Sequence, residues 1–267
     1  MRAARAAALV VGSLIALASF SGSLSSSFDY SRQDRDQFSA APSQDHWLGT
    51  DALGRDRLAR LLHGTRVSLT LAPMAAGMSV LLALVVGVPP GFLGGMSERA
   101  AKFVIDLMLS IPWLFLLLLA RALLPLNTSP ASSALLTFMM LGMLGWGVPA
   151  RILMARSRKL RQSEFILLAQ SNGASRWRLL RVHVLPNLWP LLTAQFWIAV
   201  PVFILAEANL SLLGLGVQEP LPSLGSLLRE LETVLSIRND LCSFAALLVL
   251  IAIVSSLQLA FLKHEVP

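Results

Sequence analysis

The chain has 267 residues, of which 55% are hydrophobic and 14% are charged, and its mean hydropathy is +0.67. Charged residues make up about 25% of a soluble globular domain, so this composition excludes an ordinary water-soluble fold and predicts an all-α integral membrane protein. The net charge is +7. Because the basic residues gather near the ends of apolar runs, membrane orientation explains them better than nucleic-acid binding does.

Six apolar runs predict six membrane-spanning helices, since each is close to the roughly 20 residues that a bilayer requires. They are residues 6–24, 67–93, 103–124, 134–150, 188–213 and 241–262. With both termini in the cytoplasm, 13 of the 22 Lys and Arg residues fall in cytoplasmic segments. These segments are residues 1–5, 94–102, 151–187 and 263–267. Positive flanking residues are retained in the cytoplasm, so this is the expected topology.

The first apolar run has two interpretations. Ala16-Leu17-Ala18 resembles a signal-peptide cleavage site, whereas the whole run 6–24 is nearly long enough to be a membrane anchor. We favour the anchor, and both interpretations place Ser25 outside. We therefore divide the chain into 1–66, an anchor with an extracytoplasmic loop and an amphipathic helix, and 67–267, a five-helix transmembrane domain with a cytoplasmic loop at 151–187.

A polar motif with the sequence HWLGTDALGRD occupies residues 46–56 of the extracytoplasmic loop. Its glycines permit tight turns, and Thr50-Asp51 can cap a helix. Beyond it, Leu58, Leu61 and Leu62 recur at helical spacing, which predicts an amphipathic helix with Arg57 and Arg60 turned to water or headgroups. The candidate motif residues are Gly49, Thr50, Asp51, Gly54, Arg55 and Asp56. They could seat the second span or act near the substrate entrance.

This motif closely resembles the His-x-Leu-Gly-Thr-Asp-x-x-Gly-Arg-Asp segment of the C-type permease subunit in dipeptide, oligopeptide and nickel ABC importers. About nine near-fixed positions match without a gap. The resemblance implies the type I importer permease fold, in the bacterial cytoplasmic (inner) membrane.

Residues 164–186, EFILLAQSNGASRWRLLRVHVLP, form a basic interruption between two apolar runs. Eight Lys or Arg residues lie between Arg151 and Arg181, against the single acid Glu164, so the segment is expected in the cytoplasm. The pattern predicts a helix with Phe165, Leu168 and Ala169 on one face, followed by a left-handed stop at Asn172-Gly173. A second helix restarts near Ser175 and is expected to end at Pro186.

The segment resembles the coupling loop of ABC importer permeases, which reads Glu-Ala-Ala, three residues, Gly, then about nine residues to an apolar-Leu-Pro. Gly173-Ala174-Ser175 and Leu185-Pro186 fit this pattern closely, but Leu167 stands where the family has the glutamate. Only Glu164, one helical turn earlier, carries charge on a similar face. The resemblance implies that an ATPase is contacted by Glu164, Phe165, Leu168, Ala169, Gly173, Ala174, Ser175 and Pro186.

Two ionisable residues, Asp106 and Glu207, fall inside predicted spans. A charge in the hydrocarbon costs about 2.5–3.5 kcal/mol on insertion scales, so such residues usually face a partner or a wet cavity. One interpretation places them in a translocation path or gate. The other is a structural contact, for instance with Arg121 or a backbone donor.

The sequence contains no nucleophile–base pattern, no phosphate-cradling Gly-rich loop and no metal-ligand spacing, so we expect no catalytic or metal site. The resemblance implies a non-enzymatic permease subunit that binds no cofactor and imports peptides, or alternatively nickel or another small solute. Its implied partners are membrane lipid, a homologous second permease, two ATPase subunits that use ATP and Mg, and an extracytoplasmic substrate-binding protein. An ATPase-independent secondary transporter and an intramembrane enzyme are less favoured alternatives.

Overall fold

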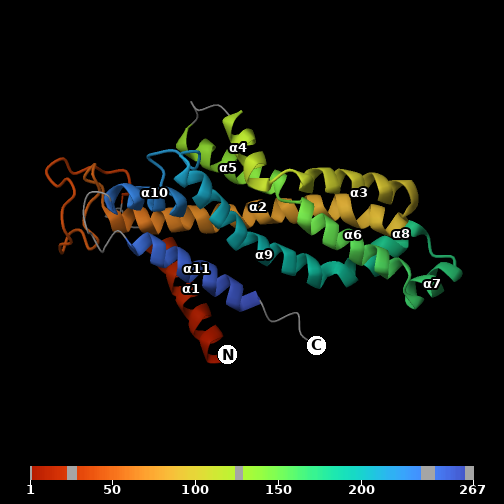
Figure 1. Cartoon of the computed structure of the whole chain (residues 1–267). Coiled ribbons are helices and arrows are strands. Elements are labelled where there is room, and N and C mark those ends of the chain that lie inside the picture. The colour runs from red at the N-terminus through yellow and green to blue at the C-terminus, as the bar shows by residue number, and fades with distance from the viewer. Residues whose placement is uncertain (1, 23–28, 124–128, 236–243, 262–267) are drawn as a thin grey trace. The chain divides into compact units, whose positions relative to one another are not determined.

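The protein is described by a computed structural model that covers residues 2–22, 29–123, 129–235 and 244–261 (Figure 1). Within these residues the regular structure is helical, apart from an isolated bridge between Thr50 and Asp56. The helices are α1 (Arg2–Gly22), α2 (Arg57–Leu93), α3 (Gly95–Ser110), α4 (Trp113–Ala122), α5 (Pro130–Leu144), α6 (Gly147–Arg161), α7 (Glu164–Ser171), α8 (Arg176–Leu179), the π-helical η1 (Leu180–Val184), α9 (Leu185–Leu212), α10 (Leu224–Leu235) and α11 (Ala245–Phe261). The all-α prediction is confirmed.

Three helical stretches among the described residues are long and apolar enough to cross a membrane by themselves. They are Arg57–Leu93, Pro130–Arg161 and Arg176–Leu212. A fourth candidate is the pair α3 and α4, and shorter apolar helices cover Leu9–Gly22 and Ala245–Ala260. Apolar helices therefore occur at all six positions where the sequence predicts a span, although part of the sixth range lies outside the described residues.

One predicted span is bent, and one predicted helix end is wrong. The third span is not one straight helix, because α3 and α4 meet at an angle of 81° around Ile111 and Pro112. Proline lacks the backbone N–H that a continuous helix needs and disfavours helical geometry in the residue before it, which explains the break. The helix after Ser175 does not end at Pro186 either, because α8 continues through η1 directly into α9.

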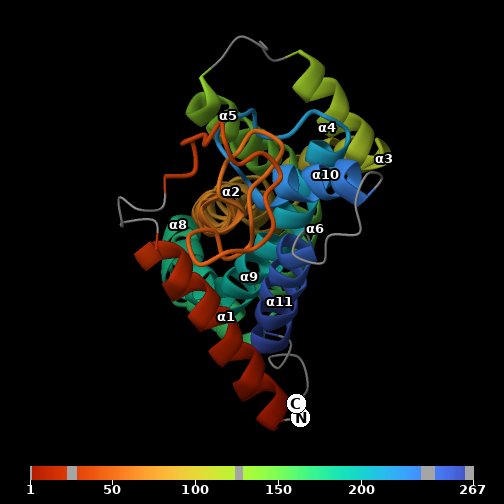
Figure 2. The same ribbon diagram turned by 90° about the vertical axis from the view of Figure 1, so that its left-hand side faces the viewer.

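The described residues group into two compact units. The first unit comprises residues 1–73, 122–138 and 200–267. Within it, α1 and α11 lie side by side although they come from opposite ends of the chain (Figure 2). Gly12 of α1 permits this approach, because a Cβ atom there would lie 2.9 Å from the Cβ of Ser256 on α11. A small residue at such a crossing lets two membrane helices pack closely.

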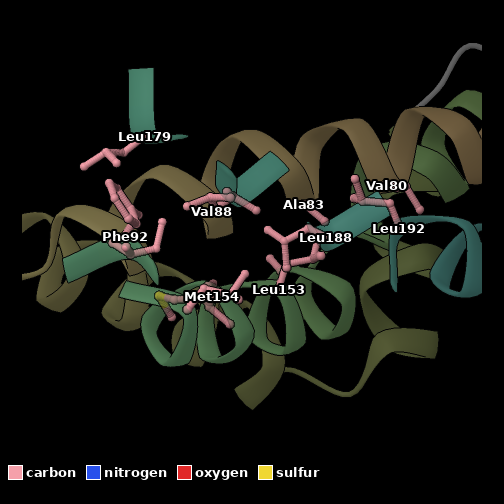
Figure 3. Packing of buried hydrophobic residues seen from close by; sticks show 14 residues of the cluster. Val80, Ala83, Val88, Phe92, Leu153, Met154, Leu179, Leu188 and Leu192 are labelled. Atoms are coloured by element: carbon pink, nitrogen blue, oxygen red, sulfur yellow. The ribbon is translucent and has the colours of Figure 1, made fainter. Parts of the chain in front are cut away.

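The second unit comprises residues 74–121 and 139–199, and its core joins α2, α6 and α9 (Figure 3). Gly87 and Gly91 on α2 form a Gly-x-x-x-Gly pair that faces α6. A Cβ atom at Gly87 would lie 2.5 Å from the carbonyl oxygen of Ala150, and one at Gly91 would lie 2.6 Å from that of Met154. This pair lets the backbones of α2 and α6 approach closely, as small residues do between membrane helices.

Candidate functional site

The extracytoplasmic motif forms a compact series of turns that immediately precedes α2 in the chain. Gly49 and Gly54 adopt φ values of +70° and +75°, which favour glycine. The Thr50 hydroxyl donates to the carbonyl of Gln37 at 2.5 Å and accepts from the backbone N–H of Ala40 at 2.8 Å. The prediction that Gly49 and Gly54 support turns is therefore confirmed by the backbone geometry.

The helix cap belongs to Asp56, whereas we expected it at Thr50-Asp51. The Asp56 Oδ1 accepts from the backbone N–H of Ala59 at 2.7 Å at the start of α2, and its Oδ2 lies 2.7 Å from Nδ1 of His46. Asp51 instead turns the chain, since its Oδ1 accepts from the N–H groups of Leu53 and Arg55 at 2.8 and 2.9 Å. A carboxylate at an N-cap satisfies N–H groups that the first helical turn leaves unpaired.

A cluster of two arginines and three carboxylates joins this motif to the outer segment after α9. We call it the ion cluster; it consists of Asp51, Arg55, Arg60, Glu219 and Glu230. The Arg55 guanidinium donates to Asp51 at 2.6 Å and to Glu219 at 2.5 Å. The Arg60 guanidinium donates to Glu219 at 2.9 Å and to Glu230. The expectation that Arg60 faces water or headgroups is wrong, because this side chain is 0% exposed.

The carboxylates around the buried arginines compensate the cost of burying their guanidinium charges. An isolated buried charge is very costly, whereas hydrogen-bonded partners make its burial tolerable. Burial by itself would raise the pKa of Glu219, but the hydrogen bonds and positive charges of Arg60 and Arg55 lower it below its ordinary value. Burial raises the pKa of Glu230 to about 7, with Asp51 and Glu219 adding to the rise and the two arginines opposing it.

Glu207 lies near the end of α9 and holds the start of α10. Its Oε1 accepts from the hydroxyls of Ser211 and Ser223, both at 2.7 Å. Ser223 and Ser226 also exchange hydrogen bonds between hydroxyl and backbone N–H, which caps α10. A carboxylate near a helix N-terminus is electrostatically favourable. This geometry supports the structural interpretation of Glu207, and its role in a translocation path or gate stays a prediction.

Asp106 on α3 pairs with Arg151 on α6, and not with Arg121 as we considered from the sequence. Both side chains are about half exposed, so the pair lies at the surface of the second unit. The pairing explains how the charge is tolerated in an apolar helix. A role of Asp106 in the translocation path stays a prediction.

The cytoplasmic segment forms a helical knob made of α7 and α8. Gly173 ends α7 at φ +79°, as the sequence predicts, and the Ser175 hydroxyl caps α8 by accepting from the N–H of Arg178 at 3.3 Å. Ala174 lies against the core of the second unit, and Pro186 is in the first turn of α9. The predicted helix, stop and restart are confirmed as structure.

The predicted face of α7 runs from the core to the surface. Phe165, Leu168 and Ala169 lie on one side of the helix at i, i+3 and i+4, as predicted, but Ala169 packs against the core beside the fully buried Ile166, whereas Phe165 and Leu168 are exposed. Four large apolar side chains of the knob are exposed: Leu168 is 66% exposed and Trp177 is 70% exposed, and Phe165 and Leu167 are exposed too. Glu164 is exposed as well. We call Phe165, Leu167, Leu168 and Trp177 the apolar knob face.

The sequence does not single out Glu219 and Glu230, because both lie between the predicted spans 188–213 and 241–262 and outside any recognised motif. A signal was present in LGSLLRELETVL, where leucines at helical spacing predict the amphipathic helix that became α10. Among the described residues, no group of three or more His, Cys, Asp or Glu side chains could hold a metal ion. Cys242 lies outside the described residues.

Several apolar helices with a basic segment between two of them define an integral membrane protein. The family model for the binding-protein-dependent transport system inner membrane component matches residues 79–264. The chain is 33% identical over 203 residues to the oligopeptide transport system permease protein OppC of Mycobacterium tuberculosis H37Rv, across 76% of this chain and 68% of that relative.

Two further relatives give the same result. OppC of Escherichia coli K12 is 34% identical over 229 residues, across 85% of this chain and 74% of the relative. The dipeptide transport system permease protein DppC of Bacillus subtilis 168 is 33% identical over 206 residues, across 77% of this chain and 62% of that relative. The chain therefore belongs to the family of binding-protein-dependent transport system inner membrane components, and it is a permease subunit of the inner membrane.

Proposed function

We propose that the chain is one of two permease subunits of an ATP-driven importer for peptides. Similarity to oligopeptide and dipeptide permeases supports this substrate class, and nickel or another small solute is the alternative. Its partners would be a homologous second permease, two ATPase subunits and an extracytoplasmic substrate-binding protein. The ATPase subunits would bind and hydrolyse ATP with Mg²⁺, and this chain would hold no cofactor of its own.

The observation that carries the proposal is the apolar knob face. Four large apolar side chains are exposed on a segment that also carries eight basic residues, where burial in lipid would be costly. Exposed apolar patches of this kind mark sites of protein–protein contact. An ATPase groove would cover the knob, and closure of the ATPase pair would push it as a rigid lever against the spans. Ile166 and Ala169 anchor α7 to the core, so a push on the knob reaches α2, α6 and α9.

Gly173 provides the first test, since it fixes the angle between α7 and α8. Its N–H donates to the carbonyl of Gln170 at 2.9 Å, and its positive φ is closed to proline. We expect Gly173→Pro to insert into the membrane but to abolish ATP-dependent peptide uptake. Asparagine tolerates this conformation and a Cβ atom meets nothing within 4 Å, so Gly173→Asn is the matched control and should retain uptake.

Purification of the tagged chain in mild detergent tests the assembly. Recovery of a second permease and two ATP-binding subunits supports the importer, and uptake assays with peptides and nickel then separate the substrate classes. Recovery of the chain without an ATPase, even after cross-linking, would contradict the proposal and favour a secondary transporter.

A further inference from the structure

A groove of about 380 Å³ lies between α3 and α6 in the second unit. We call it the α3–α6 groove. It is lined by Glu98, Lys102, Asp106, Arg151, Met154, Ala155 and Arg158. The two helices run antiparallel across it, because Glu98 pairs with Arg158 and Asp106 pairs with Arg151. Lys102 lies between these two pairs on α3, and Met154 and Ala155 of α6 complete the lining.

The lining has a surplus of positive charge. Three cations face two carboxylates, and among the described residues Lys102 makes no ion pair. The bond from Arg158 to Glu98 is long, at 3.5 Å, and Glu98 is shared with Arg161 at 3.7 Å. The side chains of Arg158 and Arg151 are 61% and 54% exposed. The groove therefore retains guanidinium and ammonium donors that its own carboxylates do not use.

Apolar side chains continue from the groove along both helices. Phe103 and Leu107 are exposed on α3, and Val148 and Ile152 are exposed on α6. The basic ends of both helices belong to the cytoplasmic side, since residues 94–102 and 151–187 carry the positive charges that orient the chain. Cations thus lie at the cytoplasmic membrane surface, and the apolar side chains extend from them toward the hydrocarbon.

We propose that the α3–α6 groove binds the headgroup of an anionic phospholipid from the cytoplasmic leaflet. Lys102 and Arg158 would hold the phosphate, with Arg151 beside them, and the acyl chains would lie along Phe103, Leu107, Val148 and Ile152. Basic pockets between membrane helices on the cytoplasmic side have the chemistry for such headgroups. A soluble phosphate would gain nothing from the apolar side chains, so the combination favours a lipid.

The test measures lipid binding to the purified complex by native mass spectrometry, with phosphatidylglycerol titrated against phosphatidylcholine. We expect the wild type to prefer phosphatidylglycerol and each removed cation to weaken its binding about fivefold. Lys102→Gln and Arg158→Gln, singly and together, are the test variants. Arg156→Gln and Lys159→Gln remove the same charge from exposed positions of α6 that do not line the groove, so they serve as matched controls.

Ala155→Trp provides an independent variant, because it places a large side chain on the lining of the groove without changing its charge. It should abolish the preference for phosphatidylglycerol while leaving the complex intact by size-exclusion chromatography. Excess glycerol phosphate should not displace the lipid if the acyl chains contribute. Equal losses in test and control variants, equal affinity for the two lipids, displacement by glycerol phosphate, or a cross-link from the groove to the second permease would each overturn the proposal.

Discussion

Arg60 is the residue on which the ion cluster depends most. It is fully buried, and its guanidinium contacts Asp51 at 3.6 Å, Glu219 and Glu230. Asp51 is buried, whereas Glu219 and Glu230 are partly exposed and remain near Arg55, so we expect Arg60→Ala to destabilise the protein by about 1–3 kcal/mol. Arg60→Lys keeps the charge but loses the fork that joins the carboxylates, so it should also destabilise, to a smaller extent.

Thermal unfolding in detergent measures both Arg60 variants. Arg35→Ala is the control, because it removes an exposed arginine from the same extracytoplasmic segment. A midpoint for Arg60→Ala that equals that of Arg35→Ala would show that the cluster contributes nothing to stability.

Glu230 gives the cluster a predictable pH dependence. Its folded-state pKa is about 7, against an ordinary value of 4.5, so the folded protein holds this proton more tightly than the unfolded chain. The contribution of this proton to the free energy of unfolding is fully present below pH 4.5 and is lost as the pH rises through 7. The charged groups that face this carboxyl are Asp51, Glu219, Arg55 and Arg60. The lowered pKa of Glu219 changes the free energy of unfolding only below about pH 4.5, so it does not affect this range.

We therefore expect the thermal unfolding temperature to decrease as the pH is raised from 5 to 8. The loss should be about 1–2 kcal/mol, since about a third of the side chain is exposed and solvent screens it. Glu230→Gln removes the titration while keeping the shape, so it should flatten this dependence. A midpoint that rises from pH 5 to pH 8 in the wild type would contradict the assigned shift.

At the scale of elements, the sequence predicts where helices begin and end better than it predicts which side of each helix is buried. The stop at Gly173 and the cap at Ser175 follow from local backbone chemistry, and both are found. The five consecutive apolar residues 165–169 have no polar side to mark the exposed face, so the sequence does not identify Ile166 as the buried contact. Likewise, Arg60 and Glu219 are 159 positions apart, and no local pattern connects them.

The apolar knob face makes a prediction for α7. Burying a leucine side chain contributes about 1.5–3 kcal/mol, so Leu168→Ala should weaken ATPase binding about tenfold or more. Leu167→Glu should weaken it too, because a charge would enter an apolar contact. Glu164→Gln should have little effect if the contact is apolar.

Co-purification of the ATPase and its stimulated hydrolysis rate measure this contact. Gln170→Ala, at an exposed position of the same helix, controls for the loss of helix surface. The opposite pattern, with Glu164→Gln defective and Leu168→Ala normal, would mean that Glu164 supplies the polar contact that Leu167 cannot.

At the scale of the whole molecule, charge distribution determines which segments meet which compartment. Residues 151–181 carry eight basic residues, a higher density than the six basic residues spread over the longer segment 25–66, so positive charge favours the cytoplasm for the first of these segments. The ion cluster and the knob should therefore face opposite sides of the membrane. Composition and hydropathy predict this, because they depend on transfer from water to lipid rather than on side-chain packing.

Single cysteines test this topology in a Cys242→Ser background, which removes the chain's only cysteine. Gln33 and Gln170 are both exposed, the first in the extracytoplasmic segment and the second on α7. In intact spheroplasts, a membrane-impermeant maleimide should label Gln33→Cys but not Gln170→Cys. After permeabilisation, both cysteines should be labelled to the same extent. Labelling of Gln170→Cys without permeabilisation would place the knob outside, where no ATPase could reach it, and would contradict both the topology and the coupling role of α7.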